Sequence, residues 1–249
     1  MRFSCLCTLA LIPGLLLAAE PKNETARQVR FLAVGELPPF RQEIRDNVRY
    51  ELEPPAGSIP PREVVLGFGA GQPEAAPLRL GQMTEALKAP VGAGPLLLSR
   101  RGDAKDSEPW LRLNRPESGN LLVLLWRDAR AGTWEKVRSL VLSDEEPAGS
   151  VRFVNCSPAP VGILLGPEKL ILEAGKAFKR PVTTGVDQIF EVHLTDTTGS
   201  LKRLHSGVIV QNPGERSLII VYRADGSGAR RPLKVIVQRE AVPAVPEKK

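Results

Sequence analysis

Short apolar segments recur along almost the whole chain, and their length and spacing constrain the fold more than any other feature. A β-rich segment begins about every ten to fifteen residues, and Gly, Pro, Asn or Asp bounds each one. The 22 glycines and 23 prolines among 249 residues favour turns over long helices. The sequence therefore predicts an all-β protein. Only residues 80–88 could form a short helix, and Gly81 weakens that helix. The expected strands are 29–32, 64–66, 78–80, 110–113, 121–126 and 137–142, then 151–154, 161–165, 170–172, 189–194, 207–210, 218–222 and 233–237.

Segments of the first half reappear in the second half in the same order. The closing strands, 137–142 and 233–237, follow the last match in each half. The matched segments are 29–31 with 151–153, 87–91 with 178–182, and 122–127 with 218–223. This pattern predicts an internal duplication that produces two tandem antiparallel β-sandwich domains of immunoglobulin-like type. The alternative is that β proteins share such patterns by chance. An insertion around residues 36–63 of the first copy accounts for the unequal offsets.

Composition places the boundaries of these units. The first sandwich is predicted at residues 29–144 and the second at 151–240. Residues 145–150, in a polar and turn-rich stretch, are predicted to be the linker. The C-terminal residues 241–249 contain spaced prolines and no core pattern, and we expect them to be disordered.

The first nineteen residues have the three parts of a secretory signal peptide. Arg2 precedes an apolar stretch that is too short to span a bilayer comfortably, and small residues end at Ala19. We expect cleavage there, a periplasmic or secreted location, and no membrane span afterwards. A retained N-terminal anchor is the alternative. Cleavage would leave Cys156 as the single cysteine, which excludes an intrachain disulfide. We expect Cys156 to be a small buried hydrophobic residue.

Motifs for catalysis, metal binding or cofactor binding are scarce. One mature cysteine with His193 and His205 cannot supply a Cys/His zinc cage, and no G-x-S-x-G elbow occurs. The glycine loop at 67–72 lacks dinucleotide-binding spacing, so no metal or cofactor is predicted. Trp126 and Tyr222 occupy matched positions and are interpreted as core aromatics of the two sandwiches.

Two other tryptophans, Trp110 and Trp134, flank predicted loops. We expect them to be exposed and available for contacts.

Basic residues are concentrated in the second half of a chain whose net charge is +6. The loops at one end of a sandwich could bring several of them together against an anionic partner. A solvated surface is the alternative. Nucleic acid is a poor candidate, since aromatic residues do not alternate with the basic ones. The candidate binding residues are Lys179, Arg180, Arg230, Arg231 and Lys234.

Residues 151–161 have the form V-R-F-x-N-x-S-x-x-P-V. This run resembles the opening strand and turn of exported bacterial β-sandwich proteins, including the periplasmic accessory proteins of alginate O-acetylation, which carry two tandem sandwiches. The resemblance implies a fold and a structural motif, and it assigns no functional residue.

These observations together predict a non-catalytic exported protein that binds or scaffolds at the cell envelope. The expected partner is an envelope protein or an anionic glycan. One alternative is an accessory factor in exopolysaccharide modification. The other is a hydrolase with dispersed catalytic residues that uses His193 or His205.

Overall fold

The computed structural model describes residues 26–68, 73–92, 94–103, 107–128, 130–195, 200–225 and 232–242. Within these residues it contains eighteen strands and no helix, which confirms the all-β prediction. Residues 80–88 do not form the short helix, because Leu80 makes an isolated bridge to Ala33 and a strand begins at Leu87. The predicted signal peptide lies outside the described residues.

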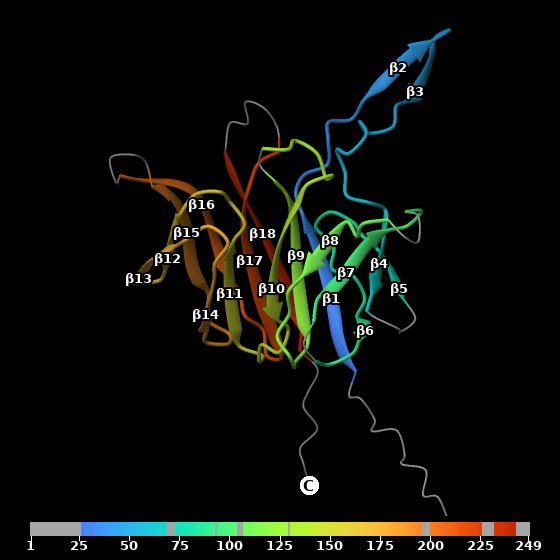
Figure 1. Cartoon of the computed structure of the whole chain (residues 1–249). Helices are drawn as coiled ribbons and strands as arrows, with labels where there is room; N and C mark the ends of the chain where they lie inside the picture. Colours follow the sequence, from blue (N-terminus) through green and yellow to red (C-terminus); the bar gives the residue numbers. More distant parts are fainter. Residues whose placement is uncertain are drawn as a thin grey trace, which may run out of the picture.

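The first half contains two four-stranded sheets and a separate hairpin (Figure 1). The inner sheet has the order β10 (Val137–Ser143), β9 (Leu121–Arg127), β1 (Arg27–Val34), β6 (Leu87–Ala89). The outer sheet has the order β5 (Glu74–Pro77), β4 (Glu63–Gly67), β7 (Leu96–Arg100), β8 (Leu111–Leu113). The hairpin consists of β2 (Gln42–Arg45) and β3 (Val48–Glu51).

The second half contains two sheets of the same size. The inner sheet has the order β18 (Leu233–Ala241), β17 (Glu215–Arg223), β11 (Ser150–Asn155), β14 (Ala177–Pro181). The outer sheet has the order β13 (Glu168–Leu172), β12 (Val161–Leu165), β15 (Gln188–Thr195), β16 (Leu201–Ile209).

Strand order is the same in the two halves once the β2–β3 hairpin is set aside. Each segment that matches in sequence lies on a strand with the same place in its sheet: β1 with β11, β6 with β14, and β9 with β17. The prediction of purely antiparallel sheets is wrong at one pair in each half, because β1 is parallel to β9 and β11 is parallel to β17. No tight turn joins these partners, so their direction is not forced to reverse.

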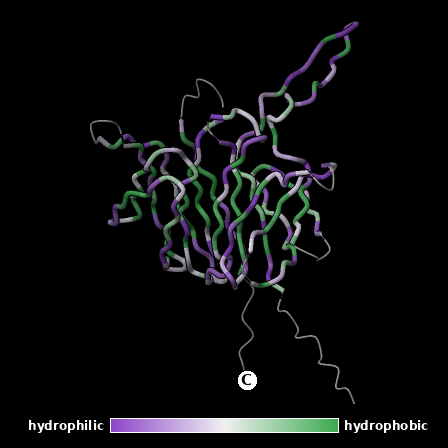
Figure 2. The backbone as a smooth tube through the Cα atoms, viewed as in Figure 1, coloured by the Kyte–Doolittle hydropathy of each residue, from purple (hydrophilic) through white to green (hydrophobic). Residues whose placement is uncertain are grey.

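Three clusters of buried side chains hold four layers of sheet together. One cluster fills the space between the sheets of the first half, and a second does so in the second half. The third lies between the two inner sheets, and we call this contact the seam. Figure 2 shows the hydrophobic residues concentrated in the strands of the body. The buried seam residues are Leu32, Val34, Leu122, Leu124, Val154, Cys156, Leu218, Ile220 and Tyr222.

β1 shows how the inner strands are built. Val29 and Phe31 alternate with Arg30 and Leu32, and successive side chains of a strand point to opposite faces. Val29 and Phe31 belong to the core of the first half, whereas Leu32 belongs to the seam. The inner strands are therefore buried on both faces, which explains their nearly continuous apolar sequences.

The placement of the aromatic residues corrects the sequence interpretation. Tyr222 is buried in the seam and Trp126 packs against the same cluster, so neither fills the space between the two sheets of its own half. Trp134 is 2% exposed and belongs to the first core, and the half-buried Trp110 donates its indole N–H to the Trp134 carbonyl at 3.0 Å. The expectation of exposed contacts from Trp110 and Trp134 is wrong.

The C-terminal boundary also differs from the prediction. Ala241 is the last residue of β18, and the Val242 amide donates to the Gly214 carbonyl at 2.7 Å. Strand pairing therefore continues into the first residue of the predicted tail, and a hydrogen bond holds the second. Residues 243–249 lie outside the described residues.

Candidate functional site

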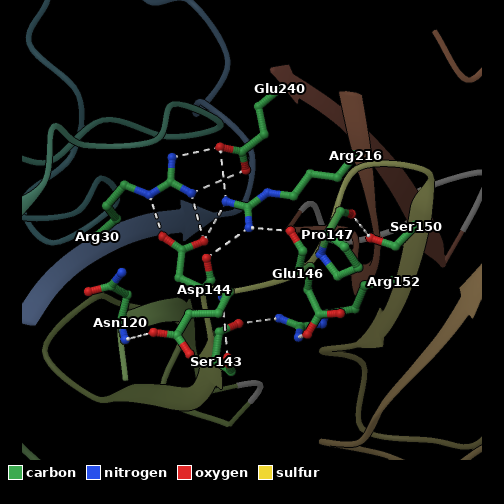
Figure 3. Close-up of polar contacts among 11 residues, drawn as sticks. Arg30, Asn120, Ser143, Asp144, Glu146, Pro147, Ser150, Arg152, Arg216 and Glu240 are labelled. Carbon is green, nitrogen blue, oxygen red and sulfur yellow. Dashed lines mark hydrogen bonds and ion pairs between the residues drawn. The ribbon is translucent and has the colours of Figure 1, made fainter. Parts of the chain in front are cut away.

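Charged residues fix one end of the seam, beside the connection between the halves (Figure 3). Arg30 donates to both Asp144 oxygens at 2.6 and 2.7 Å and to Glu240 at 2.7 Å. Arg216 also bonds Asp144, at 2.7 Å. Burial opposes the charge on Arg30, but the hydrogen bonds to Asp144 and Glu240 outweigh it and raise the pKa of Arg30. The cluster joins β1 of the first half to β17 and β18 of the second.

A second ion pair braces the same connection. Arg152 on β11 bonds Glu146, and both side chains are about 10% exposed or less. Arg152 also donates to the Ser143 carbonyl at 2.7 Å. Burial and the charge of Arg216 lower the pKa of Arg152, while Glu146 acts in the opposite direction. The connection at residues 143–150, which includes the predicted linker 145–150, is thus held by Arg30 of the first half and by Arg152 and Arg216 of the second.

The opposite end of the seam has its own polar clamp. The Glu36 amide donates to Asp225 Oδ2 at 2.7 Å, and the Asp225 amide donates to Glu36 Oε2 at 2.9 Å. Arg127 pairs with Asp225 at 2.6 Å, and Lys234 pairs with Glu36. Gly35 allows this approach, because a Cβ there would lie 2.9 Å from Asp225 Oδ2.

A groove of about 530 Å³ opens between the halves at this second end, and it is the candidate site. Its seam side is formed by Val34, Trp126, Cys156 and Tyr222. Four arginines and two aspartates supply the charges. These six residues are Arg127, Arg130, Arg138, Arg223, Asp128 and Asp225.

Arg130 and Arg138 contribute positive charge to the groove that no described carboxylate neutralises. Arg127 is neutralised by Asp225. The exposed side chains of Arg130 and Arg138 have no carboxylate partner among the residues that the structure describes. Arg138 lies opposite Trp126 in the β9–β10 register, so the two side chains share the face that looks toward the second half. A guanidinium beside an aromatic ring is suited to an anionic ligand that also has an apolar surface.

Tyr222 also lines the groove, at the position of β17 that is equivalent to Trp126 of β9. Burial raises the pKa of Tyr222 to about 12, and the negative charges of Glu36 and Asp225 add to that shift. The hydroxyl thus keeps its proton over the physiological pH range and remains able to donate a hydrogen bond.

Cys156 and Ser157 line the groove from the turn after β11. Cys156 is 2% exposed, which confirms the expectation of a buried residue, and burial raises the pKa of its thiol. The Asn155 side chain donates to the carbonyls of Ala159 and Leu172 at 2.8 and 2.9 Å, and the Ser157 hydroxyl donates to Asn155 Oδ1 at 2.7 Å. The Asn and Ser of the recognised motif therefore hold the turn in shape.

The predicted anion-binding residues do not form one patch. Lys179 and Arg180 lie on β14 and Lys234 on β18, at opposite edges of the same sheet. Each has an acidic partner within 4 Å: Lys179 with Glu146, Arg180 with Glu168, and Lys234 with Glu36.

Arg230 and Arg231 lie outside the described residues, although Arg223 and Asp225, which precede them in the sequence, line the groove. Sequence reasoning missed Arg130 and Arg138 because it looked for basic residues within the second half. The one available signal was the pair of matched arginines, Arg127 and Arg223, at the ends of β9 and β17.

The histidines lie away from the groove, in the outer sheet of the second half. His193 contacts Glu191 at 2.8 Å, and its side chain is only 12% exposed. His205 stacks at 5.4 Å from the Phe190 ring. Within the described ranges, no group of three or more potential ligands could hold a metal ion.

The same part of the chain contains no helix long and apolar enough to cross a bilayer. A comparison with protein-family models finds no matching family, and a comparison with curated proteins finds no matching relative.

Proposed function

We propose that the two halves are tandem immunoglobulin-like sandwiches that arose by internal duplication. Identical strand order supports this proposal. The seam supports it as well, because equivalent positions of the two halves contribute to the same cluster: Leu124 and Ile220, and Trp126 and Tyr222. Two related units that contact each other through the same surface are arranged as the subunits of a twofold dimer are.

We further propose that the chain is an exported, non-catalytic binding or scaffold protein of the cell envelope, and that it holds an anionic ligand in the groove between its halves. One observation carries this proposal: Arg130 and Arg138 face the groove without carboxylate partners in the described structure, beside Trp126 and Tyr222. The clamps at both ends of the seam keep the walls in place, so little ordering is needed on binding.

An acidic polysaccharide suits this groove better than a small inorganic anion. A uronic acid residue presents a carboxylate to a guanidinium and an apolar ring face to an aromatic side chain. A volume of about 530 Å³ is within the usual range for a site that encloses a small organic molecule. An accessory role in exopolysaccharide modification would require this kind of binding.

The test is a binding titration of the exported protein against a polyuronate and a neutral glucan of similar length. We expect binding of the polyuronate alone, weakened by salt because exposed charges are screened. Arg130→Ala with Arg138→Ala should lower the affinity by about tenfold or more. The control pair, Arg79→Ala with Arg112→Ala, removes the same charge from exposed positions outside the groove.

Three results would overturn the proposal: equal binding of the neutral glucan, no binding of either polymer, or equal losses in the two double variants. Replacing His193 and His205 with alanine should leave polyuronate binding unchanged, because neither lines the groove. A hydrolase that uses those histidines would instead cleave its substrate in the unmodified protein and lose that activity in the variant.

A further inference from the structure

The hairpin of β2 and β3 is the part of the first half that has no counterpart in the second. It projects away from the body (Figure 1), and we call residues 37–52 the arm. Its two strands pair with each other and with no other described strand. An isolated two-stranded hairpin is only marginally stable in water, and additional strands stabilise it.

Large hydrophobic side chains are unusually exposed along the arm. Leu37 and Phe40 are 75% and 69% exposed, the two highest values for large hydrophobic residues in the described chain. Ile44 is 61% exposed, and Val48 and Tyr50 are each 50% exposed. Such a concentration on one projecting element marks an interaction surface.

The β2 edge has main-chain groups available for a further strand. The Leu52 amide donates to the Arg41 carbonyl at 3.0 Å, which makes these two residues a hydrogen-bonded pair. Hydrogen-bonded and non-bonded pairs alternate in an antiparallel ladder. Counting along the observed register, the N–H and C=O groups of Gln42 and Ile44 therefore point away from β3.

The charges that flank Ile44 fit a second copy of the same strand. Glu43 and Arg45 lie on one face of β2 and form an ion pair at 2.7 Å, with side chains 42% and 66% exposed. If two β2 strands pair antiparallel about Ile44, Glu43 of each lies opposite Arg45 of the other. Opposite charges at such positions favour pairing.

We propose that two copies of this chain associate through their arms, by antiparallel pairing of the β2 edges centred on Ile44. The result is a four-stranded sheet in which each tip points toward the other body. The β2 edge is preferred over β3 because Leu37 and Phe40, the most exposed apolar residues described, lead into β2. The contact is separate from the groove and does not depend on the proposed ligand.

Charge reversal tests this pairing in the full chain. Glu43→Arg gives an arm with two basic residues around Ile44, and Arg45→Glu gives an arm with two acidic ones. Sedimentation velocity over a concentration series should show a dimer for the unmodified protein and a dimer dissociation constant raised about tenfold or more in each variant. An equimolar mixture of the variants should recover the dimer, because opposite charges then face each other across the contact.

Both variants also break the Glu43–Arg45 ion pair within β2, and mixing them does not restore that pair. Recovery of the dimer in the mixture therefore reports the contact between copies. Glu85→Arg and Arg112→Glu, at exposed positions of the body, are the matched controls and should dimerise normally. A monomer at all concentrations, or variants whose mixture stays monomeric, would refute the proposal.

Cross-linking then fixes the register. In a background with Cys5 and Cys7 replaced by serine, Ile44→Cys should cross-link two copies through a short bifunctional thiol reagent, because facing residues of such a pair lie about 5.5 Å apart. Tyr50→Cys should not, because the two β3 strands would lie about 14 Å apart on the outside of the new sheet. Cross-linking through Tyr50→Cys alone, or dimers unaffected by Ile44→Pro, would show that the β2 edge is not the contact.

Discussion

Glu36 and Asp225 each accept the backbone N–H of the other, at 2.7 Å for the Glu36 amide and 2.9 Å for the Asp225 amide. They are 189 residues apart in sequence. Each carboxylate also binds a cation, Lys234 for Glu36 and Arg127 for Asp225. This reciprocal contact closes the end of the seam that carries the groove, and its loss should affect both stability and binding.

Asp225→Ala should lower the free energy of unfolding by about 1–3 kcal/mol, because the Glu36 amide loses its acceptor and Arg127 its partner. Urea denaturation followed by circular dichroism measures the change. Asp103→Ala is the control, since Asp103 pairs with Arg100, three residues earlier at the end of β7. Equal losses of unfolding free energy in the two variants would mean that the clamp stabilises the protein no more than a surface ion pair does.

The loss of stability at acid pH should depend in part on Glu36. Burial opposes its ionisation, but contacts with Lys234 and the Asp225 amide outweigh burial and lower its pKa below the usual 4.5. A carboxylate with a depressed pKa in the folded state stabilises the protein above its unfolded pKa and loses that contribution as pH falls through the folded value. The stability difference between the unmodified protein and Glu36→Gln should therefore shrink below about pH 4.5. Urea titrations at several pH values test this, and a constant difference would contradict it.

Tyr222 should control an alkaline loss of stability. Its pKa rises from 10.0 to about 12 on folding, so the unfolded chain releases the proton first. The free energy of unfolding should therefore fall as pH rises from 10 toward 12. Tyr222→Phe should remove the share of this decrease that comes from Tyr222. Tyrosinate absorbance in a Tyr50→Phe variant reports Tyr222 directly, since the chain contains two tyrosines. A midpoint near 10 would show that Tyr222 is solvated.

Leucine truncations on the two faces of β9 should distinguish the seam from the core. Leu124 lies in the seam and Leu125 in the core of the first half, and both are fully buried. Each change to alanine should destabilise by about 2–5 kcal/mol. Only Leu124→Ala should speed the reaction of Cys156 with a thiol reagent, because Cys156 shares the seam cluster. The comparison uses variants of matched stability in which Cys5 and Cys7 are replaced by serine. Equal labelling rates of Cys156 in the two variants would refute the idea that the seam opens independently of the core.

The pattern of strands was predictable where apolar segments and turn residues alternate. Residues 121–126 and 218–222 were expected as strands, and they lie within β9 and β17. β7 was missed, because Leu96–Arg100 is short and its neighbourhood is rich in glycine. Asn155 and Ser157 were correctly interpreted as structural, since both bond the turn that they belong to.

The candidate site could not be predicted, because it depends on contacts between distant strands. Arg138 comes from the first half and Tyr222 from the second, and no local pattern links them. The arm was predicted only as an insertion around residues 36–63. Its projection from the body follows from the lack of any sheet beside it.

The amino-acid sequence by itself determined which residues form strands and which side chains share a face, since both follow from local alternation and turn chemistry. Only the tertiary structure decided what covers each face. Trp126 shares a face with Leu122 and Leu124 in any extended strand, yet packing of the inner sheets makes that face a seam and its open end a groove. Burial depends on the partner surface, which a one-dimensional pattern does not contain.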